Sequence, residues 1–273
     1  MPTPTLTTAI HSRPARYPDL LAAEWLKLSS QRLLLLPLLL APPCTVALSW
    51  FLCSGVDLIG TRDRTDFDRL AASFNHGVWG FLMIGAAVIG ALSITGEYAS
   101  GLIRTTFIAV PDRRRVLLAK AAVSAAVATA VGVPTAIASY GTSQVVLSGK
   151  GLGLAPGDPG VARGFLAACV LLPVAALLGL AAGVLVRHQA GAVFAVFVTL
   201  GVVPELIPEG GRFLAEAANL MPRNAWSALA SLGTADDELG PYPPSATHSW
   251  LVLAGWPLAL LVAAALVLRR RDL

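Results

Sequence analysis

The residue types that most often carry out chemistry are scattered in this sequence. None of the four histidines belongs to an HExxH pair or to a cluster with the spacing of metal ligands. These histidines are His11, His76, His188 and His248. The three cysteines lie in apolar stretches and form no CxxC pair, which predicts neither a disulfide framework nor a zinc site. They are Cys44, Cys53 and Cys169. We therefore expect no catalytic residue and no bound metal.

One short segment, Gly149-Lys150-Gly151, is similar to the end of a phosphate-binding loop. Gln144 stands where such a loop needs its first glycine, and Gly151 replaces the serine or threonine that binds magnesium. We therefore expect that this chain does not hydrolyse ATP by that route and holds no cofactor of its own.

Two sets of acidic residues could form a site. Asp63, Asp66 and Asp68 are close in sequence, but no glycine turn or terminal glutamate completes a calcium loop, which favours a solvated charged loop. Glu205 is the only acid within a predicted membrane span. An acid in that environment suggests function, although its place near the outer end also lets it reach water. An outer gate and a water-exposed surface residue both stay open for Glu205.

The high apolar content and low charge of the sequence indicate the kind of fold that must position these residues. Of the 273 residues, 55% are apolar and 13% are charged, and the mean hydropathy is +0.69. Soluble domains carry about 25% charged residues, so this excess of apolar surface has no arrangement compatible with water. The sequence predicts a single membrane domain over residues 1–273.

Helices are the expected spanning elements. A bilayer requires roughly 20 apolar residues per helix, and the alternating segments of a transmembrane barrel are absent. Because the apolar stretches are rich in Leu, Ala, Val and Gly, we predict an all-α, polytopic fold. The six expected spans are 33–53, 77–95, 121–141, 164–186, 190–208 and 249–268.

Charge asymmetry predicts the orientation. With six spans both termini lie on one side, and that side carries 13 of the basic residues against 7 on the other. The acidic residues are distributed the opposite way, 5 against 11. The positive-inside rule therefore places both termini in the cytoplasm.

The segment before the first span has two parts. Residues 1–17, rich in Pro and Thr, predict a disordered cytoplasmic tail. In residues 18–32, Leu21, Trp25 and Leu28 share a helical face, which is typical of an amphipathic helix lying in the membrane interface. A frayed extension of the first span is the other interpretation.

The connection between the second and third spans, residues 96–115, is the most informative segment. Ile103 and Phe107 share a face, which predicts a short amphipathic cytoplasmic helix that Pro111 ends. Asp112 is placed to cap the next helix. On the outer side, residues 209–248 predict two short helices at the outer leaflet before the last span.

Several motifs resemble the permease subunits of type-2 ATP-binding-cassette (ABC) transporters, in their compact six-span actinobacterial form. The resemblance covers nearly the whole chain, and it implies a place in a bacterial plasma membrane. It begins at Glu24-Trp25-x-Lys27-Leu28 and is strongest at Gly96-Glu97-Tyr98, Gly101, Ile103-Arg104-Thr105-Thr106, Ala109, Pro111, Arg113, Arg115-Val116 and Ala119-Lys120. The run Tyr98-Ala99-Ser100 departs from the expected pattern, which has a polar or basic residue directly after Tyr98.

The resemblance implies a transport subunit rather than an enzyme. In such permeases the interfacial helix and the first cytoplasmic loop contact a separate ATPase subunit, which binds ATP and magnesium. The residues that the resemblance assigns to coupling are Glu24, Lys27, Glu97, Tyr98, Gly101 and Arg104. Two permease copies would work with two ATPase copies to export an amphipathic or hydrophobic substrate such as an antibiotic, a peptide or a lipid.

Two alternatives stay open at this point. Glu97 and Arg104 could form an ordinary solvated ion pair worth under about 1 kcal/mol, and Gly101 could merely permit close packing. At the level of function, an ion- or proton-driven secondary transporter is the alternative to an ATP-driven exporter, although such proteins often show inverted repeats and ionisable residues at the membrane midplane.

Overall fold

The structure is a computed structural model that describes residues 16–55, 68–207, 211–233 and 242–270. Within these ranges every regular element is a helix and no strand is present, which confirms the all-α class. All but the last two residues of the predicted tail 1–17 lie outside the described residues.

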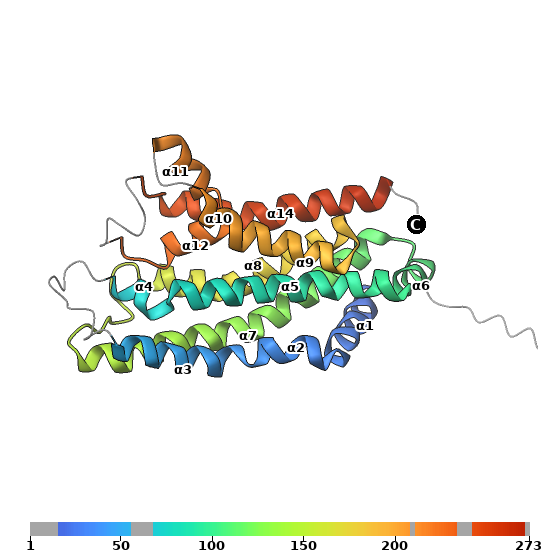
Figure 1. Ribbon diagram of the computed structural model, residues 1–273. Coiled ribbons are helices and arrows are strands. Elements are labelled where there is room, and N and C mark those ends of the chain that lie inside the picture. Colours follow the sequence, from blue (N-terminus) through green and yellow to red (C-terminus); the bar gives the residue numbers. More distant parts are fainter. Residues whose placement is uncertain (1–15, 56–67, 208–210, 234–241, 271–273) are drawn as a thin grey trace, which may run out of the picture.

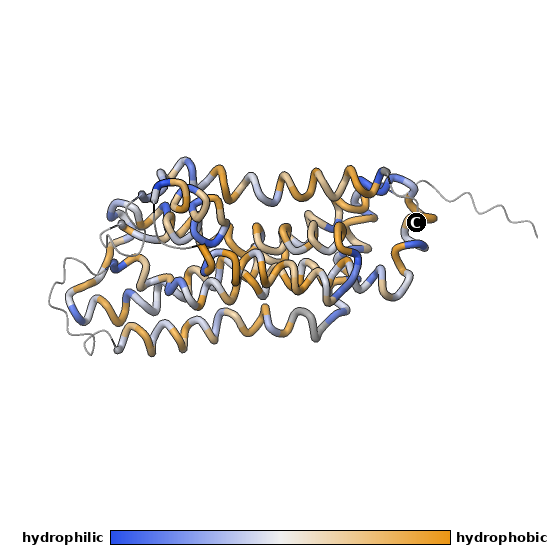
Figure 2. Tube along the Cα trace, turned by 45° about the horizontal axis from the view of Figure 1, so that its top comes forward, coloured by the Kyte–Doolittle hydropathy of each residue, from blue (hydrophilic) through white to orange (hydrophobic). Residues whose placement is uncertain are grey.

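The long helices lie side by side along one axis, with short helices at both ends (Figure 1). Hydrophilic segments gather towards these two ends, and the middle of the bundle is hydrophobic (Figure 2). At one end lie α1 (Tyr17–Ser30) and α6 (Leu102–Ala109). At the other end lie α4 (Arg69–Phe74), α11 (Gly211–Asn219) and α12 (Pro222–Leu229).

Five helical runs are long and apolar enough to cross a membrane, with mean hydropathies between 1.6 and 2.6. This character indicates a multi-pass membrane protein. The five are α5 (His76–Ser100), α7 (Arg113–Gly149), α8 (Val161–Val186), the run from α9 to α10 (Gln189–Leu206) and α14 (Ala246–Arg270).

The expected first span is divided in two. It consists of α2 (Arg32–Leu39) and α3 (Ala41–Ser54), and neither is long enough to cross a membrane alone. Pro42 and Pro43 follow the junction at Leu40, and because proline has no N–H, the backbone ladder is interrupted there. The two helices continue in nearly the same direction (Figure 1).

The fifth predicted span is also irregular. Between α9 (Gln189–Phe197) and α10 (Val203–Leu206) the backbone forms a π-helical turn, in which the Val203 N–H donates to the Val198 carbonyl. Pro204 follows directly and lacks the N–H that would continue an α-helical ladder. The span is therefore continuous in direction but not in hydrogen-bond pattern.

The third predicted span is longer than expected. We predicted 121–141, and α7 extends over 37 residues from Arg113 to Gly149, roughly 55 Å at 1.5 Å per residue. The side chain of Asp112 accepts hydrogen bonds from the backbone of Arg114 and Arg115 at 3.2 and 3.3 Å, which confirms the predicted cap.

Helix α1 packs against the bundle through a face that contains a charged residue. Leu20, Glu24 and Leu28 are buried, whereas Trp25 is 53% exposed. The predicted face of Leu21, Trp25 and Leu28 is therefore divided, because Leu28 packs into the protein while Trp25 points away from it. Once Glu24 is paired inside the protein, the buried face passes through it.

At the opposite end, Asp68 belongs to no solvated loop. Its carboxylate accepts from the backbone of Leu70 and Ala71 at the start of α4. It also accepts from the backbone of Leu232 and Gly233 after α12. The carboxylate thus joins the start of α4 to the segment that follows α12. The other acidic residues of that predicted loop, Asp63 and Asp66 among them, lie outside the described residues.

The two short helices predicted within residues 209–248 are present as α11 and α12, and only α12 is packed into the bundle. Trp226 and Leu229 are completely buried, while Phe213 on α11 is 80% exposed. Trp226 stacks on Trp79 of α5 with ring centroids 5.9 Å apart.

Helices α5 and α8 are in backbone contact. A Cβ atom on Gly179 would lie 1.7 Å from the Ala87 carbonyl oxygen, and one on Gly90 would lie 2.0 Å from the Ala176 carbonyl oxygen. Lipid tails are as apolar as the side chains, so close packing of small residues is a major force that brings helices together in a bilayer. These glycines make the α5–α8 contact the centre of the bundle.

We expect Gly179→Ala to lower the free energy of unfolding by about 1–3 kcal/mol, because the added methyl group overlaps backbone that cannot turn aside. Thermal unfolding of the purified protein in detergent measures the change. The matched control is Gly141→Ala on α7, where a Cβ atom meets nothing within 4 Å. Equal effects of the two substitutions would contradict this packing.

Candidate functional site

Four charged side chains from three helices meet where α1 crosses the bundle. Lys27 of α1 lies 2.7 Å from Glu24 and 3.1 Å from Glu97 at the end of α5. Lys120 of α7 lies 2.5 Å from Glu24 and 2.8 Å from Glu97. Each lysine contacts both glutamates, so the four form a closed ring of ion pairs, which we call the charge cluster.

The charge cluster is buried. The side chains of Glu24, Glu97 and Lys120 are 4–5% exposed, and that of Lys27 is 25% exposed. Isolated charges in such surroundings would be expensive, and two of each sign cancel. In sequence order the chain supplies Glu24 and Lys27 one helical turn apart on α1, while the other two come from the ends of α5 and α7.

Both ammonium groups have three acceptors, which matches their three N–H donors. Besides the two glutamates, Lys120 Nζ donates to the Ser93 carbonyl at 3.5 Å, and Lys27 Nζ donates to Thr106 Oγ1 at 3.4 Å. Thr106 belongs to α6. Lys27 therefore links α1 to the short helix as well as to α5.

The environment of Lys27 raises its pKa. Burial by itself lowers the pKa, but the hydrogen bond and charge of Glu24, together with those of Glu97, outweigh burial and hold it above the usual 10.5. The ammonium is therefore charged throughout the physiological range.

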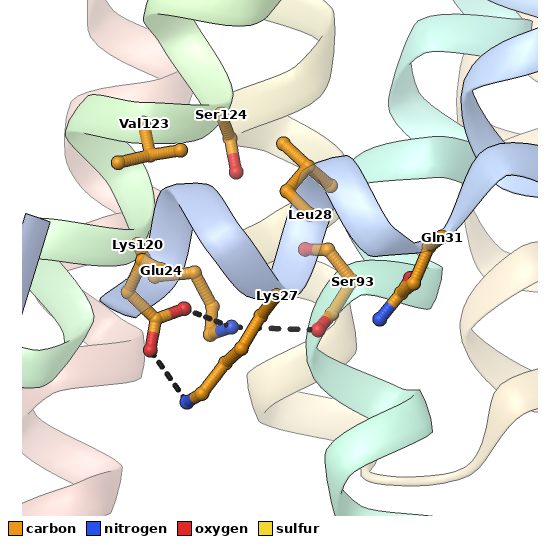
Figure 3. A pocket seen from close by; sticks show the side chains of 8 residues that line it. All are labelled: Glu24, Lys27, Leu28, Gln31, Ser93, Lys120, Val123 and Ser124. Atoms are coloured by element: carbon orange, nitrogen blue, oxygen red, sulfur yellow. Dashed lines mark hydrogen bonds and ion pairs between the residues drawn. The ribbon is translucent and has the colours of Figure 1, made fainter. Parts of the chain in front are cut away.

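A small cavity adjoins the cluster under α1 (Figure 3). Its volume, about 10 Å³, is roughly the space that one water molecule needs. The residues that line it are Glu24, Lys27, Leu28, Gln31, Ser93, Lys120, Val123 and Ser124.

The last turn of α5 leads directly into α6 through Gly101. This glycine has φ +74° and ends α5 in the left-handed conformation that favours glycine. A Cβ atom there would meet nothing within 4 Å, so the interpretation of Gly101 as a close-packing residue is wrong. Its conformation is what turns the chain from α5 into α6.

Helix α6 turns one face inwards and leaves the other uncovered. Ile103 is 3% exposed, whereas Ile108 is 82% exposed and Arg104 faces outwards. Because Glu97 is buried among two lysines, the interpretation of Glu97 and Arg104 as a solvated pair is also wrong. Arg104 and Ile108 instead form a mixed basic and apolar surface.

Tyr98 points to a different neighbour from Glu97. The guanidinium of Arg187, in the turn between α8 and α9, lies over the Tyr98 ring at 5.4 Å from its centroid. Neither Tyr98 nor Arg104 contributes an ion pair to the charge cluster among the described residues.

Glu205 lies at the opposite end of the molecule. It is 65% exposed and forms an ion pair with Arg223 of α12. The structure therefore separates Glu205 from the other six predicted site residues, and the carboxylate joins α10 to α12 at the surface. The prediction of an outer gate remains a prediction.

Sequence reasoning missed two residues as site members. Lys120 was noted within the family-like loop pattern and as a basic residue near a span end, yet its single charge between Ala119 and Ala121 was the signal of a buried partner. Arg187 carried no comparable pattern, because the ring of Tyr98 that it covers is 89 positions away.

Comparison with known proteins adds no identity. The sequence matches no protein-family model, and no curated protein matches it significantly.

We expect Lys120→Met to destabilise the protein by about 3–5 kcal/mol, because Glu24 and Glu97 then stay buried with one lysine between them. The double variant Lys120→Met with Glu97→Gln should recover part of this loss, since Glu24 and Lys27 remain as a balanced pair. Denaturant unfolding in detergent measures both.

The control is Arg115→Gln, which removes an ion pair to Asp112 whose side chains are 64% and 48% exposed. It should cost under about 1 kcal/mol. A double variant less stable than Lys120→Met alone would refute the charge balance.

The raised pKa of Lys27 predicts a loss of stability at alkaline pH. The charged form is favoured by folding, so its contribution is complete below the unfolded value of 10.5 and disappears as pH rises through the higher folded value. The difference in unfolding free energy between the natural protein and Lys27→Met should be constant up to about pH 10 and shrink above it. A difference that shrinks near pH 7 would contradict the raised pKa.

Proposed function

We propose that this chain is the membrane-spanning subunit of an ATP-driven exporter of the type-2 ABC class, energised by a separate ATPase subunit. The observation that supports it best is the charge cluster, which ties α1 and α6 at one end of the bundle to the ends of two long helices. A force applied to α1 or α6 would reach α5 and α7 through paired charges rather than through a flexible linker.

In this proposal α2 and α3 together form one further span, the first in chain order, which brings the total to six. Both termini then face the cytoplasm of a bacterial cell, and the membrane is its plasma membrane. Helix α1 then lies at the cytoplasmic interface, where the exposed Trp25 ring suits headgroup depth. Helix α6 lies at the same end (Figure 1) and acts as the coupling helix.

The proposed surface for the ATPase subunit is the face of α6 that points away from the bundle. Arg104 supplies a charged donor and Ile108 an apolar contact, and this combination is common at the centres of protein interfaces. Glu24, Lys27 and Glu97 act as positioning residues beneath it. Gly101 sets the direction of α6. ATP and magnesium belong to the ATPase subunit.

The proposed assembly has two copies of this chain and two ATPase subunits. Closure of the ATPases on ATP would push α6 and α1, and the charge cluster would transmit the push to α5 and α7. The helices that line the contact between the two copies would then repack and open a path for an amphipathic or hydrophobic substrate, outwards or sideways into the outer leaflet. Membrane lipid surrounds both copies.

An ion-driven secondary transporter is the second candidate, and buried carboxylates are what it would use. The described carboxylates do not favour it. Glu24 and Glu97 are each paired with two lysines near one end of the bundle, and Glu205 is exposed near the other. Neither position corresponds to the membrane midplane where such transporters bind ions.

The proposal is tested by purifying the tagged full chain from its native membrane and identifying stoichiometric partners. We expect a soluble ATPase subunit to co-purify. Ile108→Asp and Arg104→Glu should each reduce its recovery by about tenfold or more, because they place an acid on the docking face without touching the charge cluster.

The control is Arg212→Glu, an equally exposed charge reversal on α11 at the other end of the molecule. It should leave the recovery of the ATPase unchanged. Purification of the chain alone, with transport in vesicles that depends on an ion gradient and not on ATP, would overturn the proposal in favour of the second candidate.

A further inference from the structure

Three buried donor atoms at the end of the bundle that carries α1 and α6 have no acceptor. The Nε and Nη2 atoms of Arg187 and the hydroxyl of Tyr98 are inaccessible to solvent and have no hydrogen-bond partner at bonding distance among the described residues, although the guanidinium faces the hydroxyl. Buried polar groups in native proteins are nearly always paired, and a buried N–H group of a guanidinium without an acceptor is costly. A ligand with oxygen acceptors would satisfy all three.

Arg187 also occupies a backbone position that favours another residue. It follows the last residue of α8 with φ +60°, the left-handed conformation in which helices commonly end on glycine. An arginine there costs free energy relative to glycine. Part of this cost is offset by the contact of the guanidinium with the Tyr98 ring. Because its buried N–H groups have no acceptor at bonding distance, no other contact within the protein offsets the remaining free-energy cost of an arginine at this position.

The surroundings favour a negative charge. Helix α9 begins two residues after Arg187 and helix α7 begins at Arg113, and the amino end of a helix is its positive end. The nearest described acid in sequence is Glu97. Its Oε1 atom is paired with Lys27 and Lys120, while its Oε2 atom is buried without a hydrogen-bond partner. The carboxyl ends of α5 and α8 contribute the opposite sign, which the positive charge of Arg187 itself offsets.

We propose that Arg187 and Tyr98 form a binding site for a phosphate group. A guanidinium edge binds two phosphate oxygens at once, and a tyrosine hydroxyl donates to a third. The site lies one residue beyond the end of α8. Because α8 is long and apolar enough to cross a membrane, a residue just past its end would lie near the lipid headgroups. The phosphate of a phospholipid in that leaflet reaches this depth, and basic sites between membrane helices bind such headgroups.

The test uses the purified full chain in detergent and native mass spectrometry with three probes. These are phosphatidylglycerol, a diacylglycerol with the same acyl chains and no phosphate, and inorganic phosphate as a competitor. We expect phosphatidylglycerol to bind at least tenfold more tightly than the diacylglycerol.

The decisive variant is Arg187→Gly, which relieves the left-handed backbone and removes the guanidinium. We expect its thermal unfolding temperature to be unchanged or higher, while binding of phosphatidylglycerol weakens about tenfold or more, the usual loss for hydrogen bonds to a charged group. Tyr98→Phe keeps the ring under Arg187 and should show a smaller loss. Arg114→Gln removes one exposed charge from the same end of the bundle and is the matched control.

The outcomes distinguish the source of the phosphate. Binding of phosphatidylglycerol that depends on Arg187 and resists inorganic phosphate supports a lipid-borne phosphate. Displacement by inorganic phosphate, again dependent on Arg187, supports a site for a soluble phosphate. Equal binding by the natural protein, Arg187→Gly and Arg114→Gln overturns the proposal. The result does not depend on whether the chain couples to an ATPase.

Discussion

The backbone contact between α5 and α8 is the constraint on which the rest of the bundle depends. In lipid, apolar side chains gain little by leaving their surroundings, so helices associate through contacts that only close approach allows. Gly90 and Gly179 permit that approach, with carbonyl oxygens of the facing helix where side chains would otherwise stand. Because both helices are rigid, this contact also fixes where their last turns lie.

The charge cluster follows from that placement. Glu97 lies in the last turn of α5, and the position of α5 brings its carboxylate to Lys120 of α7. A single pair there would barely repay the cost of removing two charges from water. The addition of Glu24 and Lys27 from α1 doubles the contacts of each charge and gives every ammonium N–H an acceptor. Helix α1 is thus held by electrostatic geometry that an apolar contact would not specify.

The sequence predicts the long helices better than their interruptions. Composition and apolar length identify the helical runs α5, α7, α8 and α14, because burial in lipid demands about 20 apolar residues regardless of neighbours. The division at Leu40 and the π-helical turn at Val198–Val202 depend on how the chain resolves the missing N–H groups of its prolines, which three-dimensional packing decides.

The site is predictable in its residue types and not in its pairings. Five of the seven predicted residues, Glu24, Lys27, Glu97, Tyr98 and Gly101, have specific roles in the geometry at one end. The solvated pair of Glu97 with Arg104, one of the interpretations that the sequence leaves open, is wrong because the partners of Glu97 lie on other helices. The left-handed turn at Gly101 directs α6 away from α5. Glu97 therefore pairs with Lys27, 70 positions earlier in the sequence, and with Lys120, 23 positions later.

The last turn of α5 therefore contacts or leads into three different parts of the protein. Successive residues of a helix point about 100° apart, so Glu97 and Tyr98 necessarily face different neighbours. Glu97 faces the charge cluster of α1 and α7, Tyr98 faces Arg187 in the turn between α8 and α9, and Gly101 redirects the chain into α6. In the proposed mechanism, a displacement of α6 by an ATPase subunit would enter the bundle at this turn. It would reach the charge cluster and the proposed phosphate site together, because both are anchored to neighbouring residues of one rigid helix.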